Sequence, residues 1–254
     1  MKNRPPYALE SVDNALRLLQ LLRDQGRLRV TEAAEELGTA RSTAHRLLSM
    51  LVYRGFAIQD ERRGYLPGPA LSAPPVRDRP LQELRRALLP HMDALCERVD
   101  ETVSLMVRVG TQARFLVSVE STQVLRVGDR AGTVLPAART SGGKALLARL
   151  GQAELDQSGG GGGDDNALSR AEFQRLCEEL ETVRRCGYGV NREETEAGVV
   201  AVGCCVTDEA GHAHGALSIA VPTARFRNDQ IQPFARELAL TAQRAAPDIP
   251  LHSA

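Results

Sequence analysis

The sequence predicts an α+β protein with two structural parts, and three observations lead to this prediction. Residues 9–54 contain three segments whose apolar residues recur at helical spacing. A connector with five prolines, residues 67–80, then interrupts the regular pattern. Beyond the connector, antiparallel strands with alternating apolar residues are mixed with helices. We therefore expect one domain over residues 9–68, a linker with a helix over 69–99, and a second domain over 100–250.

The first predicted domain begins with three short helices. Val12, Leu16, Leu19 and Leu22 recur at helical spacing in the first helix. Side-chain hydroxyls are favoured at helix starts, and glycines are favoured just past helix ends. The expected caps of the three helices are Ser11, Thr31 and Thr39, and the expected ends of the second and third are Gly38 and Gly55.

The third helix has two unlike faces. Its apolar face consists of Ala44, Leu47, Leu48, Leu51 and Val52. Its polar face consists of Arg41, Ser42, Thr43, His45, Arg46 and Ser49. An apolar face can pack on a core while the opposite face enters a DNA major groove, so the pattern indicates a helix-turn-helix.

A short hairpin follows, with strands at Phe56–Ile58 and Tyr65–Leu66 joined by Asp60–Gly64, and Arg62 and Arg63 at its tip. Such a wing can contact the DNA backbone or the minor groove. The candidate DNA-binding residues are Thr31, Thr39, Arg41, Ser42, Thr43, His45, Arg46, Arg62 and Arg63. Exposed arginines are also ordinary surface charges, and helix pairs occur in bundles that bind only protein. A binding module without DNA stays an alternative at this point.

The second predicted domain follows a helix from Leu81 to about Val99, which Pro90 is expected to kink. Strands are expected at 103–109, 115–119, 199–207 and 213–221, and helices at 143–149, 170–186 and 228–245. We expect the helices to gather on one side of an antiparallel sheet. The glycine-rich segment Ser158–Asn166 is expected to be a flexible spacer, because a phosphate-binding loop has fixed spacing and opens a helix.

Charge and hydropathy exclude several classes of protein. The net charge is zero, although residues 1–68 carry three more basic than acidic side chains, as suits a modestly basic DNA reader. No apolar run approaches the roughly 18 residues of a membrane span. The N-terminus lacks the apolar segment of a secretion signal. We expect a cytoplasmic protein without membrane contact.

The five cysteines show no Cys-x-x-Cys spacing. Cys204 and Cys205 are adjacent, and His212 and His214 follow shortly, so a metal site or a catalytic thiol has to be considered. Adjacent residues of a strand point to opposite faces, so one ion could hardly bind both cysteines. We expect no metal, no cofactor and no catalytic residue. An enzyme with a fused DNA-binding head, using these cysteines and histidines, is the competing class, although Gly-x-Ser-x-Gly is absent.

Several motifs in order resemble the IclR family of transcriptional regulators. They are residues 11–19 (SVDNALRLL), 37–48 (LGTARSTAHRLL), 65–68 (YLPG), 143–148 (GKALLA), 187–191 (GYGVN), 193–198 (EETEAG) and 216–222 (ALSIAVP). The resemblance implies a winged helix-turn-helix joined by a linker helix to a GAF-like effector domain. It also implies dimers through the DNA-binding domains, paired into tetramers through the effector domains, on palindromic or repeated double-stranded operator DNA.

The resemblance further implies a small-molecule site at particular positions. These are Val127, Leu135, Ser141, Gly142, Asn191, Ala201, Ser218 and Ala220. Family members that bind small carboxylates tend to have Asp where this chain has Asn191, and Cys and Ser where it has Ala201 and Ala220. With two polar groups replaced by methyls, the site suits a larger effector such as an aromatic or aliphatic organic acid. Arg139 is the first candidate to bind its carboxylate, and Arg192 is the second. The sequence thus predicts an effector-controlled regulator, with repression as the expected sign.

Overall fold

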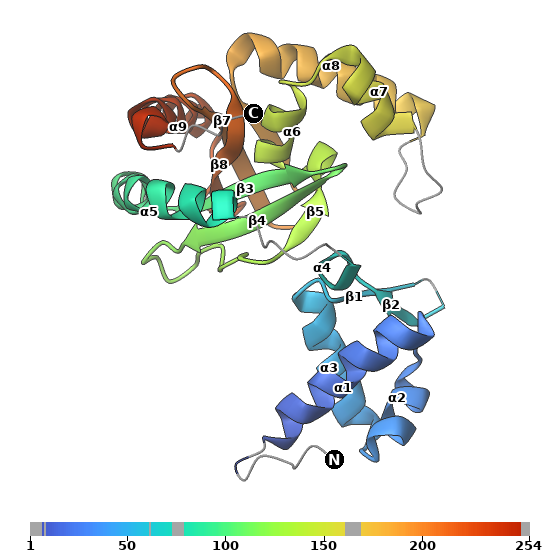
Figure 1. The fold of residues 1–254 in the computed structure, drawn as a ribbon. Helices are drawn as coiled ribbons and strands as arrows, with labels where there is room; N and C mark the ends of the chain where they lie inside the picture. Colours follow the sequence, from blue (N-terminus) through green and yellow to red (C-terminus); the bar gives the residue numbers. More distant parts are fainter. Residues whose placement is uncertain (1–6, 8, 61, 73–78, 161–168, 250–254) are drawn as a thin grey trace. The chain divides into compact units, whose positions relative to one another are not determined.

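The computed structural model describes residues 7, 9–60, 62–72, 79–160 and 169–249. The chain divides into two compact units, residues 1–75 and 76–254, which are described separately below (Figure 1). Among the described residues, no helix combines the length and the apolar character that a membrane span requires.

The N-terminal unit is a winged helix-turn-helix, as the sequence predicts. Its elements are α1 (Glu10–Gln25), α2 (Val30–Leu37), α3 (Arg41–Tyr53), β1 (Ala57–Gln59), β2 (Tyr65–Pro67) and the short α4 (Pro69–Ser72). Gly38 ends α2 with φ of 65°, a left-handed conformation that glycine adopts without strain. β1 and β2 pair antiparallel. Buried side chains from all three helices and the hairpin form one core, which includes Leu18, Leu22, Leu37, Leu48 and Tyr65.

The three predicted helix caps are wrong. α1 begins at Glu10 after Leu9, α2 at Val30 after Arg29, and α3 at Arg41 after Ala40, and none of these preceding residues caps its helix with a side chain. Ser11 and Thr31 therefore lie inside the first turns, and Thr39 lies one residue too early. Hydroxyl residues mark the neighbourhood of a helix start, but its register depends on packing, and boundaries shift by one or two residues. The connector is also not wholly irregular, because α4 lies within it.

The C-terminal unit contains one six-stranded antiparallel sheet. Its strands are β3 (Thr102–Val109), β4 (Gln112–Val119), β5 (Val134–Pro136), β6 (Gly189–Arg192), β7 (Val199–Thr207) and β8 (Ala213–Pro222), in the order β5-β4-β3-β8-β7-β6. Its helices are α5 (Arg79–Val99), α6 (Ser141–Leu147), α7 (Gln152–Gly160), α8 (Arg170–Cys186) and α9 (Ile231–Ala245), with three-residue 3-10 helices at Ala137–Arg139, Asn228–Gln230 and Ala246–Asp248. The short strands β5 and β6 were not predicted.

The helices cover both faces of this sheet, which corrects the expectation of a single covered side (Figure 1). α5 and α9 pack on one face through residues such as Leu88, Leu95 and Leu238. α6 and α8 cover the other face through Ala145 and Leu180. The strands are buried on both sides over much of their length, and β3 is buried at six successive positions. Such strands need cover on both faces.

Pro90 lies inside α5, which continues as one helix to Val99, so the kink expected there stays a prediction. Residues 158–160 of the predicted spacer belong to the end of α7, and 161–166 lie outside the described residues.

Candidate functional site

The polar face of α3 is open to solvent. Its exposed residues are Arg41, Ser42, Thr43, His45, Arg46 and Ser49. Ala44, Leu48 and Leu51 are buried in the core of the unit. This division is the one that the sequence predicts, except that Val52 is 37% exposed. A helix that is packed on one side and polar on the other can lie in a major groove.

The side chains on this face are available to a ligand. Among the described residues, no hydrogen bond or ion pair involves the guanidinium of Arg41 or Arg46, whereas Ser49 donates to the carbonyl of His45 within the helix at 2.8 Å. Thr31 and Thr39 are both half-buried, and the Thr39 hydroxyl oxygen is buried without a partner in the part of the chain described. The two threonines therefore present less of their side chains than the α3 residues do.

The wing is held in shape by Asp60. Its carboxylate accepts hydrogen bonds from the amide of Gly64 at 2.6 Å and from the guanidinium of Arg27 at 2.7 Å. These contacts lower the pKa of Asp60, with the Gly64 amide as the largest cause. Arg62 and Arg63 are exposed at the tip, and Arg63 has φ of 58°. The turn thus projects two cations away from the unit's core.

In the C-terminal unit, four strands bring the predicted effector residues into one row. Asn191 is paired with Ala201, Ala201 with Ala220, and Ala220 with Thr102. Directly paired residues point to the same face of a sheet. Val127, from the segment between β4 and β5, packs on Ala201 and Ala220 as a small buried apolar cluster.

A second row lies two residues further along the strands, at the start of α6. The hydroxyl oxygens of Ser218 and Ser141 are 2.9 Å apart, and both side chains are buried. A Cβ on Gly203 would lie 2.5 Å from the amide nitrogen of Gly142, so only glycine permits this close approach of helix and strand. The structure therefore brings together Val127, Ser141, Gly142, Asn191, Ala201, Ser218 and Ala220.

Asn191 is held by a buried cation through one intermediate residue. Its amide oxygen accepts from the main chain of Glu194 at 3.0 Å. The Glu194 carboxylate in turn accepts from Lys144 Nζ at 2.7 Å. Lys144 is 1% exposed, and its ammonium also donates to Glu179 at 2.7 Å and to the Val190 carbonyl at 3.0 Å. All three ammonium hydrogens have acceptors, which fixes the turn after β6.

Three predicted effector residues lie elsewhere. Leu135 packs with the cluster beneath α6 and α8. Arg139 is exposed and close enough to Glu172, at the start of α8, to contribute to lowering its pKa, although the hydrogen bonds from Ser169 are the larger cause. Arg192 donates to Asn228 at 2.9 Å and lies over the Phe226 ring. Neither arginine reaches the two rows in this structure.

Sequence reasoning missed several polar residues of the same face. Ser104 and Ser118 are paired across β3 and β4, with their hydroxyls 2.9 Å apart. The Thr102 hydroxyl donates to the carbonyl of Val127 at 2.6 Å. Thr102, Ser104 and Ser218 alternate with apolar residues along their strands, and that alternation of small hydroxyl residues is the signal that could have located them.

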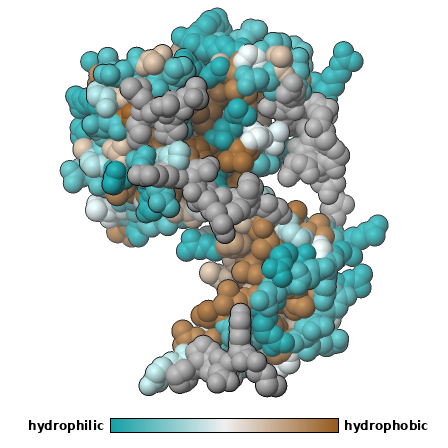
Figure 2. Space-filling view, in the orientation of Figure 1, coloured by the Kyte–Doolittle hydropathy of each residue, from teal (hydrophilic) through white to brown (hydrophobic). Residues whose placement is uncertain are grey.

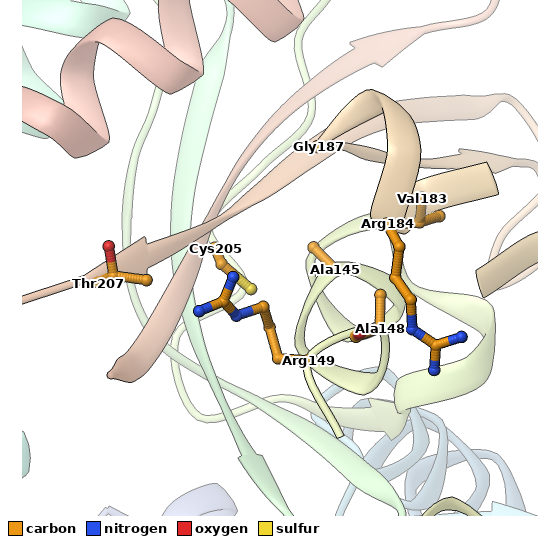
Figure 3. A pocket seen from close by; sticks show the side chains of 8 residues that line it. All are labelled: Ala145, Ala148, Arg149, Val183, Arg184, Gly187, Cys205 and Thr207. Carbon is orange, nitrogen blue, oxygen red and sulfur yellow. Dashed lines mark hydrogen bonds between the residues drawn. The ribbon is translucent and has the colours of Figure 1, made fainter. Parts of the chain in front are cut away.

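Two cavities of this unit are lined by residues that do not belong to the two rows. One cavity of about 420 Å³ lies between α6, α8 and β7, and Ala145, Arg149, Arg184 and Cys205 are among its lining residues (Figure 3). Another of about 410 Å³ lies beside α5. The residues of the two rows are themselves buried.

Cys204 and Cys205 are packed on opposite faces of the sheet. Cys204 lies in the core beneath α5 and α9, and Cys205 packs on the opposite side with the α6 cluster, as strand alternation predicts. Burial raises the pKa of the Cys204 thiol to about 12 and that of Cys205 to about 11. His214 instead binds Asp208 at 2.9 Å. Across the residues described, no group of three side chains could hold a metal ion.

Comparison with known proteins assigns both units. The helix-turn-helix model of the IclR family matches residues 11–61, and the model of the bacterial transcriptional regulator IclR C-terminal domain matches residues 81–246. The chain belongs to the IclR family. IclR-family proteins are DNA-binding transcription regulators with an effector-binding C-terminal domain, so this chain is a regulator and not an enzyme.

Individual IclR-family proteins resemble the chain over nearly its full length. It is 29% identical to the acetate operon repressor of Salmonella typhimurium, covering 96% of this chain and 89% of that protein. It is 27% identical to the regulator XynR of Escherichia coli, covering 91% and 93%. The crystal structure of Thermotoga maritima IclR matches with a TM-score of 0.60 and 24% identity, covering 95% and 99%. An IclR homologue from Microbacterium hydrocarbonoxydans, complexed with 4-hydroxybenzoate, matches with a TM-score of 0.59 and 21% identity, covering 94% and 98%.

Proposed function

We propose that this IclR-family chain is a cytoplasmic repressor that reads an operator with α3 and is controlled by an organic acid. The observation that carries the DNA part is the open polar face of α3, with Arg41 and Arg46 exposed while Ala44 and Leu48 are buried. The acetate operon repressor, a relative over nearly the whole chain, supports repression as the sign. The base readers on this face are Arg41, Ser42, Thr43, His45 and Arg46, and Arg62 and Arg63 of the wing bind the backbone.

The effector proposed is an aromatic or aliphatic acid with an apolar body. Val127, Ala201 and Ala220 offer methyl groups, and Ser218 and Asn191 offer polar atoms beside them. Such a surface suits an apolar ligand with few polar groups. The homologue that was crystallised with 4-hydroxybenzoate supports an aromatic acid. Calorimetry with aromatic and short aliphatic acids tests this part, and tight binding of glyoxylate-like molecules alone contradicts it.

The repressor acts as a dimer through α1. Leu9, Val12 and Leu16 are 69%, 50% and 54% exposed, at positions that share one helix face. Apolar side chains reach the surface of this unit in Figure 2. A dimer presents two recognition helices to two half-sites about one helical turn apart. Leu16→Asp is expected to lower the mass in sedimentation, and an unchanged mass contradicts the interface.

Gel shifts with DNA flanking the gene test the DNA part. Arg41→Ala and Arg46→Ala are expected to weaken binding by about 1–3 kcal/mol each if they read base edges. Arg23→Ala is the matched control, because Arg23 is an exposed arginine of the same unit that pairs with Asp24 at the end of α1. Equal losses in all three variants would indicate a general charge effect instead of readout by α3.

A further inference from the structure

The ion pair between Arg130 and Glu196 is placed at the proposed effector site. Arg130 belongs to the segment that joins β4 to β5, residues 120–133, and Glu196 belongs to the turn between β6 and β7. The guanidinium of Arg130 donates to the Glu196 carboxylate. Arg130 and Glu196 are 66 residues apart in sequence, and their segments connect strands at opposite edges of the sheet.

The position of Arg130 over the sheet follows from its main chain. Its amide donates to the hydroxyl of Ser118 on β4 at 3.2 Å. Ser118 faces Ser104 on β3, whose register partner on β8 is Ser218, so all three side chains lie on the α6 face. Strands β3 and β8 separate β4 from β7 and β6. The pair with Glu196 therefore bridges these two strands at the end of the sheet where the turn lies.

The same segment covers the apolar wall of the site. Val127 packs on Ala201 and Ala220, and its carbonyl accepts the Thr102 hydroxyl. Three residues later the segment supplies Arg130. One stretch of chain thus supplies an apolar side chain that packs on Ala201 and Ala220 and, three residues later, a guanidinium that is paired with the turn after β6, the two kinds of group that an organic acid requires.

The two partners of the ion pair differ in their exposure to solvent. The Arg130 side chain is 18% exposed, whereas that of Glu196 is 54% exposed. Exchanging one carboxylate for another leaves the guanidinium paired, because the ligand carboxylate gives up hydration while the exposed Glu196 carboxylate regains it. Arg binds carboxylates through two parallel hydrogen bonds, so a ligand carboxylate can take the place of Glu196 without loss of geometry.

We infer that Arg130 is the carboxylate-binding residue of the effector site. Glu196 is paired with its guanidinium until the acid binds and replaces it. This inference rests on the proposed function and deepens it, because it selects ligands with one carboxylate and an apolar body over their uncharged analogues. Neither Arg139 nor Arg192, the two arginines that the sequence suggested, lies at this place.

The test uses calorimetry on the full chain at pH 7 with benzoate, phenylacetate and hexanoate. The affinity for each acid is compared with the affinity for the corresponding amide. Wild type is expected to prefer acids over amides, and Arg130→Gln is expected to lose this preference, by about 10- to 100-fold in affinity for the acids. Binding of the amides by Arg130→Gln stays unchanged. Glu196→Gln is expected to bind the acids more tightly, because the competing carboxylate is gone, and misfolding cannot produce such a gain.

Matched controls are available in the same segment. Arg126 pairs with Glu120 at 2.8 Å, and both side chains are well exposed. Arg126→Gln and Glu120→Gln are expected to leave the acid preference unchanged. Arg149→Gln tests the separate cavity beside Cys205. The inference is overturned if Arg130→Gln keeps the preference, if Arg149→Gln loses it, or if wild type binds none of the acids.

Gel shifts on the same samples distinguish a failure of this inference from a failure of the proposed function. If DNA is bound and the acids release it equally from wild type and Arg130→Gln, the inference fails while the proposed function stands. If no flanking DNA is bound, the proposed function fails, and calorimetry still decides the role of Arg130.

Discussion

Replacing Lys144 tests the link between α6 and the turn after β6, whose Glu194 bonds to Asn191. Lys144→Met keeps an aliphatic side chain but removes the ammonium, which donates to Glu179, Glu194 and the Val190 carbonyl. Hydrogen bonds to charged groups contribute about 1.5–3 kcal/mol each, and breaking a buried pair costs about 3–5 kcal/mol. Water hydrates the unpaired carboxylates and reduces this cost, because the side chains of Glu179 and Glu194 are 42% and 34% exposed. We expect Lys144→Met to lower the free energy of unfolding by about 2–4 kcal/mol.

Lys144→Ala separates the packing of the stem from the charge. It also removes three buried methylene groups at about 0.8 kcal/mol each, so it is expected to cost about 2 kcal/mol more than Lys144→Met. Urea unfolding is followed by circular dichroism, because the chain has no tryptophan. Arg126→Met, which breaks an exposed pair, is the control and is expected to cost less than about 1 kcal/mol. The reasoning is refuted if Lys144→Met matches wild type or if the two Lys144 variants are equally stable.

Three further predictions concern other parts of the chain. Gly203→Ala is expected to displace α6 from β7 and to lower the melting temperature of the C-terminal unit, since its Cβ would lie 2.5 Å from the Gly142 nitrogen; an unchanged thermal transition contradicts this close contact. The pKa of Asp208 is lowered to about 2, chiefly by the hydrogen bond from His214, so its contribution to stability is complete above the ordinary aspartate pKa near 3.9 and is lost as pH falls through about 2. Asp208→Asn is expected to be less stable than wild type at pH 6, with a difference that shrinks in acid titrations; a constant difference contradicts the assignment. Gly68→Ala is expected to disrupt the wing and to weaken DNA binding, because its Cβ would lie 2.3 Å from the Gly55 carbonyl oxygen; wild-type gel shifts of this variant contradict it.

Local patterns were enough for the elements whose identity depends on periodicity. α8 and β7 have the predicted bounds, because helical spacing and strand alternation are properties of neighbouring residues. The division of α3 into a buried and an open face follows for the same reason. The opposite orientation of Cys204 and Cys205 is likewise a direct consequence of the strand period.

The face of α1 that is buried could not be predicted from periodicity alone. Val12 and Leu16 have the spacing of a core stripe, yet the buried residues of the helix are Asn14, Leu18 and Leu22. The apolar residues of this helix occupy more than one face, and only the packing of α2 and α3 decides which face is inside. The helix starts were misplaced for a related reason, because a side-chain cap competes with packing over one or two residues.

What the sequence by itself determined is the family and the helix-turn-helix, together with the small residues that we propose for effector binding, since motifs and periodicity are local. Only the tertiary structure decided that Arg130, and not Arg139, pairs with Glu196 in the turn after β6 and that Lys144 is buried among acceptors. The physical reason is that hydrogen bonds and ion pairs depend on distances between segments such as 120–133 and 193–198, which strand order sets and sequence spacing does not express.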